Sequence, residues 1–212
     1  MKKQLLTALA VVASLCGYAQ TKGTNALSLG ISSQTTKSDY TIASGNSSQE
    51  QKYNRFTLGY GHFISDNSKL EISLSYLKAR FTSSAVTQNN KAQGFGGSIS
   101  YQKYYPLIGK FYAYAGAVGG FSTEEVKYDD PSLHRNNNSD TYSAGAYGGI
   151  TWFISKRWAF ETRLLSANAS YVTNDQSDSD PNGAIYKNKQ TSFNLSTDGF
   201  INNLGFKIYL LF

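Results

Sequence analysis

One polar stretch of the chain has the residue types and the spacing of a cation-binding loop. Asp178, Asp180 and Asn182 precede Gly183, as in the first half of an EF-hand calcium loop, D-x-D-x-N-G. Their oxygen atoms can gather on one cation around the tight glycine turn. The position of the bidentate Glu is Lys189, however, and such residues are also common in exposed turns. We therefore expect a solvated loop, with Asp178, Asp180 and Asn182 as a weak calcium candidate.

The two histidines, His62 and His134, are the candidates for acid–base chemistry. Nucleophilic catalysis needs a Ser or Cys beside a base that a third group orients. Ser65 follows His62 by three residues, and His134 lies in a polar stretch, but neither belongs to an obvious Ser/His/acid set. The only cysteine, Cys16, lies in the N-terminal segment. We expect no enzymatic activity, no catalytic residue and no cofactor.

Five charged residues fall on the inward-facing positions of the alternating segments: Arg55, Glu71, Glu161, Arg163 and Lys207. In β-strands, such alternation places them together on the face opposite the apolar one. Ions confined in an interior are costly unless they are paired. We therefore expect a lumen charge network that acts as a salt-bridged plug, with Glu161 paired to Lys207. A gated or water-filled pore is the alternative.

The elements that would position these charges are eight segments with period-two alternation. Apolar and polar side chains alternate in most of them, which is the weak signal of a membrane-spanning β-strand. In the fifth segment, Ala, Gly and Tyr dominate, and the outward face cannot be chosen. The segments lie at about residues 24–33, 55–61, 70–76, 95–102, 110–126, 143–152, 158–164 and 204–212.

The connections between these segments alternate between short and long, as in outer-membrane barrels. Short turns are expected at 65–68, 106–109 and 155–157, and longer polar loops at about 35–52, 84–92, 128–140 and 174–190. Aromatic residues cluster near the short turns, which predicts an aromatic girdle at one membrane surface. A soluble β-barrel or sandwich also alternates, but the small polar residues of the second face would make a poor soluble exterior. The sequence therefore predicts an all-β, eight-stranded antiparallel transmembrane up-and-down β-barrel.

The N-terminal segment reads as a targeting signal. Lys2 and Lys3 precede an apolar core at 5–15, and Gly17-Tyr18-Ala19 supplies the small-x-small pattern of a cleavage site. We expect residues 1–19 to be a cleaved signal peptide and residues 20–212 to form the barrel domain. A retained anchor helix, or a lipid on Cys16, is the less favoured reading.

Composition excludes several other classes of protein. The chain has 212 residues, of which 14% are aromatic and only 16% are charged, and this argues against disorder. After the N-terminus no apolar run reaches the roughly 18 residues of a membrane-spanning helix. The basic residues are scattered rather than interleaved with aromatics, so nucleic-acid binding has no support.

The C-terminal residues carry a resemblance to a known family. Apolar side chains alternate up to a terminal aromatic, at Phe206, Ile208, Leu210 and Phe212. This ending resembles the assembly signal of outer-membrane barrels. The chain from about residue 20 onward resembles the small eight-stranded barrels similar to outer-membrane proteins A and X, in the broad porin-like family.

The resemblance implies a location, partners and a range of functions. It implies the bacterial outer membrane, with the barrel assembly machinery, membrane lipid and lipopolysaccharide as partners, and we expect a monomer. The favoured function is non-enzymatic, with exposed loops that mediate surface interaction or envelope integrity through an unknown ligand. The alternatives are a narrow porin for small solutes and a lipid A-modifying enzyme, since some barrels of this size use a His with Ser or Glu for that chemistry.

Overall fold

The computed structural model describes residues 21–42, 45–83, 89–127, 134–179, 185–199 and 204–212, and nearly all of them lie in β-strands. Among these residues, no helix is long and apolar enough to cross a bilayer. The strands in the described part of the chain are β1 (Asn25–Ile42), β2 (Gly45–Ser65), β3 (Ser68–Ser83), β4 (Asn89–Ile108), β5 (Phe111–Lys127), β6 (His134–Phe153), β7 (Trp158–Ser179), β8 (Ile185–Gly199) and β9 (Leu204–Leu211).

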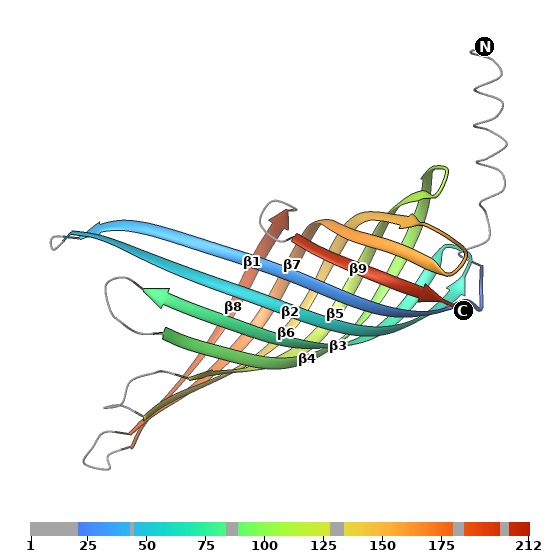
Figure 1. Ribbon diagram of the computed structural model, residues 1–212. Helices are drawn as coiled ribbons and strands as arrows, with labels where there is room; N and C mark the ends of the chain where they lie inside the picture. Colours follow the sequence, from blue (N-terminus) through green and yellow to red (C-terminus); the bar gives the residue numbers. More distant parts are fainter. Residues whose placement is uncertain (1–20, 43–44, 84–88, 128–133, 180–184, 200–203) are drawn as a thin grey trace.

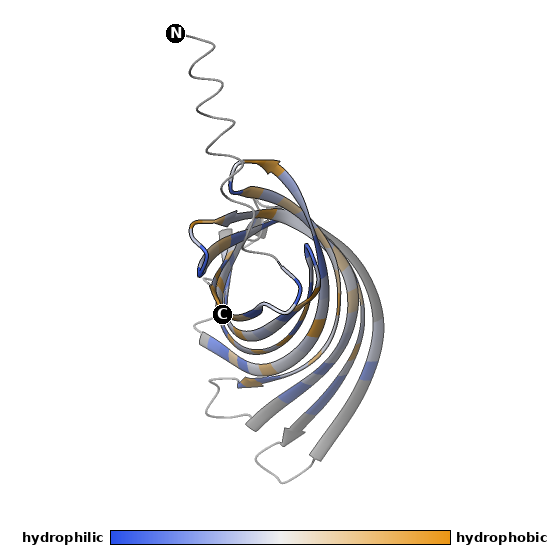
Figure 2. Ribbon diagram, turned by 90° about the vertical axis from the view of Figure 1, so that its right-hand side faces the viewer, coloured by the Kyte–Doolittle hydropathy of each residue, from blue (hydrophilic) through white to orange (hydrophobic). Residues whose placement is uncertain are grey.

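The strands form one antiparallel sheet that closes into a ring of eight (Figure 1, Figure 2). Each strand from β1 to β7 pairs with the next one along the chain. β8 and β9 share the eighth position, because β8 pairs with β7 along Leu165–Ser179 and β9 pairs with β7 along Trp158–Thr162. β9 also pairs with β1 and so closes the ring. The predicted eight-stranded up-and-down barrel is therefore confirmed.

The short β2–β3, β4–β5 and β6–β7 connections lie at the same end of the barrel as the C-terminus, and we call this the turn end (Figure 1). Asn25 and Phe212 exchange two backbone hydrogen bonds there, of 2.8 and 3.0 Å. Two turns use left-handed backbone, at Asn67 (φ 60°) and Gly109 (φ 57°). Asn and Gly adopt that conformation at the lowest cost, which suits them to these tight turns. We call the opposite end the far end.

The outer face of the ring is apolar along the half nearer the turn end. Leu29, Ile72 and Leu74 are 64%, 61% and 66% exposed, and the same outward pattern continues on the other strands. The inner face carries buried aromatic and apolar side chains near the turn end, and Ser, Thr, Gly and a few charged residues farther along the strands. Such a surface would be unfavourable in water and is favourable against hydrocarbon, as in barrels that span a membrane.

Two strands show facings that alternation did not predict. In β5, Tyr114 points into the barrel and is buried, whereas Phe111 and Phe121 are exposed on the outside. In β7, Leu164 lies in a bulge between the pairs Gly148–Leu165 and Gly149–Arg163. Leu165, and not Leu164 as the simple alternation predicts, takes the outward position and is 61% exposed. The extra residue of the bulge shifts the alternation by one position.

Aromatic side chains gather on the outer face near the turn end. Phe111 and Trp152 stack there with ring centroids 5.6 Å apart, and Tyr101, Trp158 and Phe212 are also exposed. Tyr104 and Phe153, which belong to the same aromatic clusters in the sequence, point inward and are buried. The outward aromatics have the placement expected of an interfacial girdle.

At the far end the strands continue through most of the residues that the sequence predicts as loops. The expected loop at 35–52 is instead a hairpin in which β1 and β2 remain paired up to Ile42 and Gly45. β7 and β8 similarly extend into the expected loop at 174–190. Antiparallel pairing satisfies the backbone whatever the side chains are, so strands with two polar faces form without any apolar alternation to reveal them.

Closure of the ring is limited to its apolar part. β1 pairs with β9 from Ala26 to Ser33, and the outward apolar side chains of β1 end at Ile31. Beyond Ser33, toward the far end, β8 takes the place of β9 and pairs with β7 alone among the described strands. Lipid cannot satisfy an open sheet edge, whereas water can. The seam is thus closed over the stretch where its outer face is apolar.

Candidate functional site

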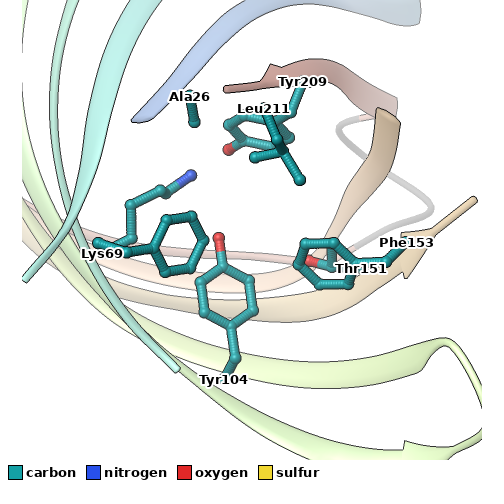
Figure 3. A pocket seen from close by; sticks show the side chains of 8 residues that line it. Ala26, Lys69, Tyr104, Thr151, Phe153, Tyr209 and Leu211 are labelled. Carbon is teal, nitrogen blue, oxygen red and sulfur yellow. The ribbon is translucent and has the colours of Figure 1, made fainter. Parts of the chain in front are cut away.

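The interior near the turn end is filled by apolar and aromatic side chains. Figure 3 shows Tyr104, Phe153, Tyr209 and Leu211 converging on the space beside Lys69. The Tyr104 ring lies 6.0 Å from that of Phe153, and all four of these residues are buried. These side chains leave no space for a water molecule between them. The barrel is therefore packed shut at this level, as expected for an eight-stranded interior.

A cluster of three charged residues adjoins this packed layer on the side of the far end. Glu71 accepts from the Lys69 ammonium at 2.8 Å on Oε2 and from the Lys207 ammonium at 2.7 Å on Oε1. The Glu71 and Lys69 side chains are each only 1% exposed, while Lys207 is 22% exposed. The Lys69 ammonium also lies 3.7 Å from the centroid of the Tyr209 ring. One carboxylate thus serves two cations, with an aromatic face stabilising one of them.

Glycines on β2 make room for this cluster. A Cβ at Gly59 would lie 2.7 Å from Glu71 Oε1, and a Cβ at Gly61 would lie 2.9 Å from Lys69 Cδ. Both distances are below normal contact, so only glycine fits beside the buried pair without movement. The alternation of glycines in β2 is therefore a requirement of the charge cluster on the neighbouring strand β3.

Glu161 is held by neutral donors and not by a cation. Its Oε1 accepts from Gln102 Nε2 at 3.0 Å and from the Tyr209 hydroxyl at 3.1 Å. Its Oε2 accepts from Thr151 Oγ1 at 3.1 Å and from the Tyr104 hydroxyl at 3.4 Å. Each carboxylate oxygen accepts two hydrogen bonds, which offsets much of the cost of burying the charge.

The expected ion pair between Glu161 and Lys207 is wrong. The two residues are direct neighbours across β7 and β9, as expected, but the Lys207 side chain reaches Glu71 instead. Lys69 completes the cluster and was missed. Its signal was present in the sequence, because Lys69 precedes Glu71 by two residues and strand alternation places both on one face. Lys207 pairs with Glu71 because its side chain reaches across the lumen. The pairing of neighbouring strands alone does not reveal this contact.

A polar cavity of about 460 Å³ lies on the far-end side of the charge cluster. Along β3, Lys69 and Glu71 are followed by Ser73 and Ser75, which line this cavity. The other strands contribute small side chains and two tyrosines, Tyr114 and Tyr147. The charged residues of the lining are Arg55, Arg163, Lys207 and Glu161.

Arg55 lies close enough to Arg163 to be repelled by it, and close enough to Glu124 to be attracted by it. The Arg163 guanidinium stacks 4.6 Å from the centroid of the Tyr147 ring. No carboxylate oxygen among the described side chains lies within 4.0 Å of either guanidinium. All five residues of the expected lumen network therefore face inward, but only Glu71 and Lys207 form an ion pair.

The other candidates for chemistry remain separate from this interior. His62 is exposed near the turn end, where its Nδ1 lies 2.9 Å from Asn25 Oδ1. Among the described residues no three His, Cys, Asp or Glu side chains gather into a metal site. The calcium candidates Asp180 and Asn182, and the side chains of Asp178 and His134, lie outside the described residues.

The residues of the predicted assembly signal lie on the outer face of β9 and just after it. Phe206 and Ile208 are exposed, and the Phe206 ring packs 5.2 Å from that of Phe160 on β7. Leu210 is half-buried, and Phe212 is 65% exposed at the rim. The alternation of this segment is therefore the outward face of the strand that closes the ring.

Comparison with known proteins finds likeness at the level of structure. No protein-family model matches the chain, and no curated protein matches it. Neisserial surface protein A is 13% identical over 89% of this chain and 97% of its own, with a TM-score of 0.45. A major outer membrane protein from Thermus thermophilus is 9% identical over 89% of this chain and 99% of its own, with a TM-score of 0.49.

Outer membrane protein AlkL, solved in DMPC lipid bilayers, is 13% identical over 91% of this chain and 92% of its own, with a TM-score of 0.45. At such identities these likenesses concern the fold alone, and no residue role or ligand passes from those proteins to this chain.

Proposed function

We propose that this chain is a closed, non-enzymatic outer-membrane barrel whose far-end hairpins act at the cell surface, in surface interaction or envelope integrity. The packed turn end supports this proposal most strongly. A solute that enters the polar cavity meets the Lys69–Glu71–Lys207 cluster, and beyond it a layer without space for water. An eight-stranded barrel is just wide enough for its own side chains to fill it. The turn end faces the periplasm, which leaves the far end outside the cell.

The chemistry of the far end also supports a position in water. Outward positions that carry Leu and Ile near the turn end carry charged residues farther along the same strands. On the outer face of β1 and β2, Glu50 forms ion pairs with Lys37 at 3.6 Å and with Lys52 at 2.6 Å. Such a charged surface is excluded from hydrocarbon. The hairpins thus project beyond the bilayer and present side chains to the outside.

Planar-bilayer recordings test the closed lumen against the narrow porin. We expect no steady conductance from the purified barrel, because the packed layer blocks the path. The charge cluster provides the matched variant: Lys69→Ala opens space in the same layer and should introduce measurable conductance. Steady conductance of the wild-type barrel would favour the porin. Mass spectrometry of lipid A from a deletion strain tests the enzymatic alternative, and an altered lipid A would contradict a non-enzymatic role.

Trimming one hairpin tests the surface role. Lys37 and Glu50 are paired across β1 and β2, so Asn-Gly in place of residues 38–49 rejoins the strands through a two-residue turn. The trimmed barrel should assemble normally but should not restore detergent resistance, or capture of an extracellular partner, to a deletion strain. Full restoration by the trimmed protein would overturn the role of this hairpin.

A further inference from the structure

Four cations lie in register across the outer face of β2, β3, β4 and β5. Lys52 is directly opposite Arg80, Arg80 is opposite Lys91, and Lys91 is opposite Lys127. All four side chains are exposed. With strands about 4.8 Å apart, this row spans about 14 Å of the barrel surface. We call these residues the cationic row.

The cationic row is electrostatically unfavourable in isolation. Like charges directly opposite each other in a sheet destabilise it. Lys52 and Lys127 at the two ends have carboxylate partners, Glu50 at 2.6 Å and Glu125 at 3.7 Å. For Arg80 and Lys91 in the middle, no carboxylate oxygen of the described residues lies within 4.0 Å. An external anion would offset the repulsion in the middle of the row.

The position of the cationic row along the barrel axis, relative to the outward aromatic residues, identifies the source of that anion. Phe56, Tyr76 and Phe95 face outward in register on the same strands, and Tyr76 packs 5.0 Å from Phe95. The cationic row follows this aromatic row after four residues of strand. With the usual strand tilt, four residues raise it about 10 Å above the aromatics. Aromatic belts mark the membrane surface, so the row stands at the outer limit of the lipid headgroups.

We propose that the cationic row binds the phosphate groups of a phosphorylated glycolipid of the outer leaflet, with Arg80 and Lys91 as its central contacts. Arg binds phosphate in a bidentate manner and Lys binds it as a point charge. An array of four cations suits a ligand with several phosphates better than a single anion. This inference rests on the proposed orientation for its cellular meaning, but binding itself does not depend on that orientation.

The test uses the complete barrel, refolded in an uncharged detergent, and fluorescently labelled lipopolysaccharide as the probe. We expect tighter binding of the phosphorylated form than of an enzymatically dephosphorylated form. The double variant Arg80→Gln/Lys91→Gln should bind the phosphorylated form at least tenfold more weakly. The matched control Lys110→Gln/Arg157→Gln removes two exposed cations at the turn end and should change affinity by less than twofold.

Two results would overturn the proposal: equal binding of the two forms by the wild-type barrel, or unchanged binding by the double variant. Stability without the lipid separates binding from a structural role. Removing like charges should leave the urea midpoint of the double variant unchanged or raised, and a lowered midpoint would show that the row supports the fold instead. The orientation is tested separately by labelling on intact cells, so failure of the orientation and failure of binding are distinguishable.

Discussion

At the residue scale, Glu71 is the carboxylate on which the buried charges depend. It accepts from two ammonium groups, and one of them belongs to Lys69, whose side chain is almost inaccessible to water. Breaking a buried ion pair by removal of one partner costs more than the pair contributes, because the other ion remains buried. The consequences of changing Glu71 and Lys207 therefore differ.

We predict that Glu71→Gln lowers the free energy of unfolding by about 3–5 kcal/mol, since it removes the carboxylate that is hydrogen-bonded to the buried Lys69. Lys207→Gln should cost less, because Glu71 keeps Lys69 and the Lys207 side chain is partly hydrated. Urea titration of the refolded barrel measures both. Glu125→Gln, in the exposed pair with Lys127, is the control and should change stability by less than about 1 kcal/mol.

A double-mutant cycle identifies the true partner of Lys207. Glu71→Gln and Lys207→Gln should be coupled, whereas Glu161→Gln and Lys207→Gln should be additive within about 0.3–0.5 kcal/mol. Coupling between Glu161 and Lys207, with additivity at Glu71, would contradict the observed pairing.

Gly59 provides a third prediction at this scale. Gly59→Ala places a methyl group against Ser28 Oγ and 2.7 Å from Glu71 Oε1. It should destabilise the barrel by about 1–3 kcal/mol, because it forces the buried hydroxyl and carboxylate to move. Gly97→Ala is the matched control, since its nearest neighbour is 3.8 Å away, and should change stability by no more than about 0.5 kcal/mol. Equal urea midpoints for the two variants would show that the space beside Glu71 is not limiting.

At the scale of single elements, the alternation of apolar and polar residues predicted those strands whose two faces meet different surroundings, lipid on one face and the lumen on the other. Leu70, Ile72 and Leu74 face outward from β3 as expected, because lipid on one side and a narrow lumen on the other select opposite residue types. The same rule fails in β5, where small residues occupy both faces, and in β7, where the bulge at Leu164 interrupts the period. It also fails beyond the membrane, where neither face selects for apolar residues.

For the lumen, the sequence identified the charged residues but not their partners. Facing follows from position along one strand, and this placed Glu71, Glu161 and Lys207 inside the barrel. Partner choice depends on how far each side chain reaches across the ring and on neutral donors such as Tyr209, which come from distant parts of the chain. Such contacts require the closed barrel and cannot be read from one strand at a time.

The C-terminal segment gives a prediction at the element scale. The Phe212 side chain is 65% exposed, whereas its backbone is hydrogen-bonded to Asn25. The side chain therefore contributes little to the pairing of the first and last strands. Phe212→Ser should nevertheless reduce the amount of barrel in the outer membrane, through loss of the assembly signal, as immunoblots of membrane fractions would measure. Phe111→Ser removes another exposed aromatic at the turn end and should leave the amount unchanged. Equal levels of both variants would count against the signal.

At the scale of the whole molecule, the two ends of the barrel face different compartments. In a Cys16→Ser background, Ser38→Cys places a single thiol on the far end of β1, and Ser65→Cys places one at the turn end. We predict that a membrane-impermeant maleimide labels the thiol at position 38 but not the thiol at position 65 on intact cells, and labels both after lysis. Exclusive labelling at position 65 would invert the orientation.

The short seam between β1 and β9 has a consequence for how this chain folds. The seam pairs residues that are separated by nearly the full length of the chain. Its pairs run only from Ala26–Leu211 to Ser33–Leu204. The other neighbouring strands of the ring are much closer to each other in sequence. Loop-closure entropy and contact order therefore make the seam the slowest step, while the hairpins can form early. Until the seam closes, the first and last strands have free edges that any other unfolded chain could pair with. Closure is therefore the step that an assembly factor would accelerate most, by bringing β9, which Phe212 follows, to the free edge of β1.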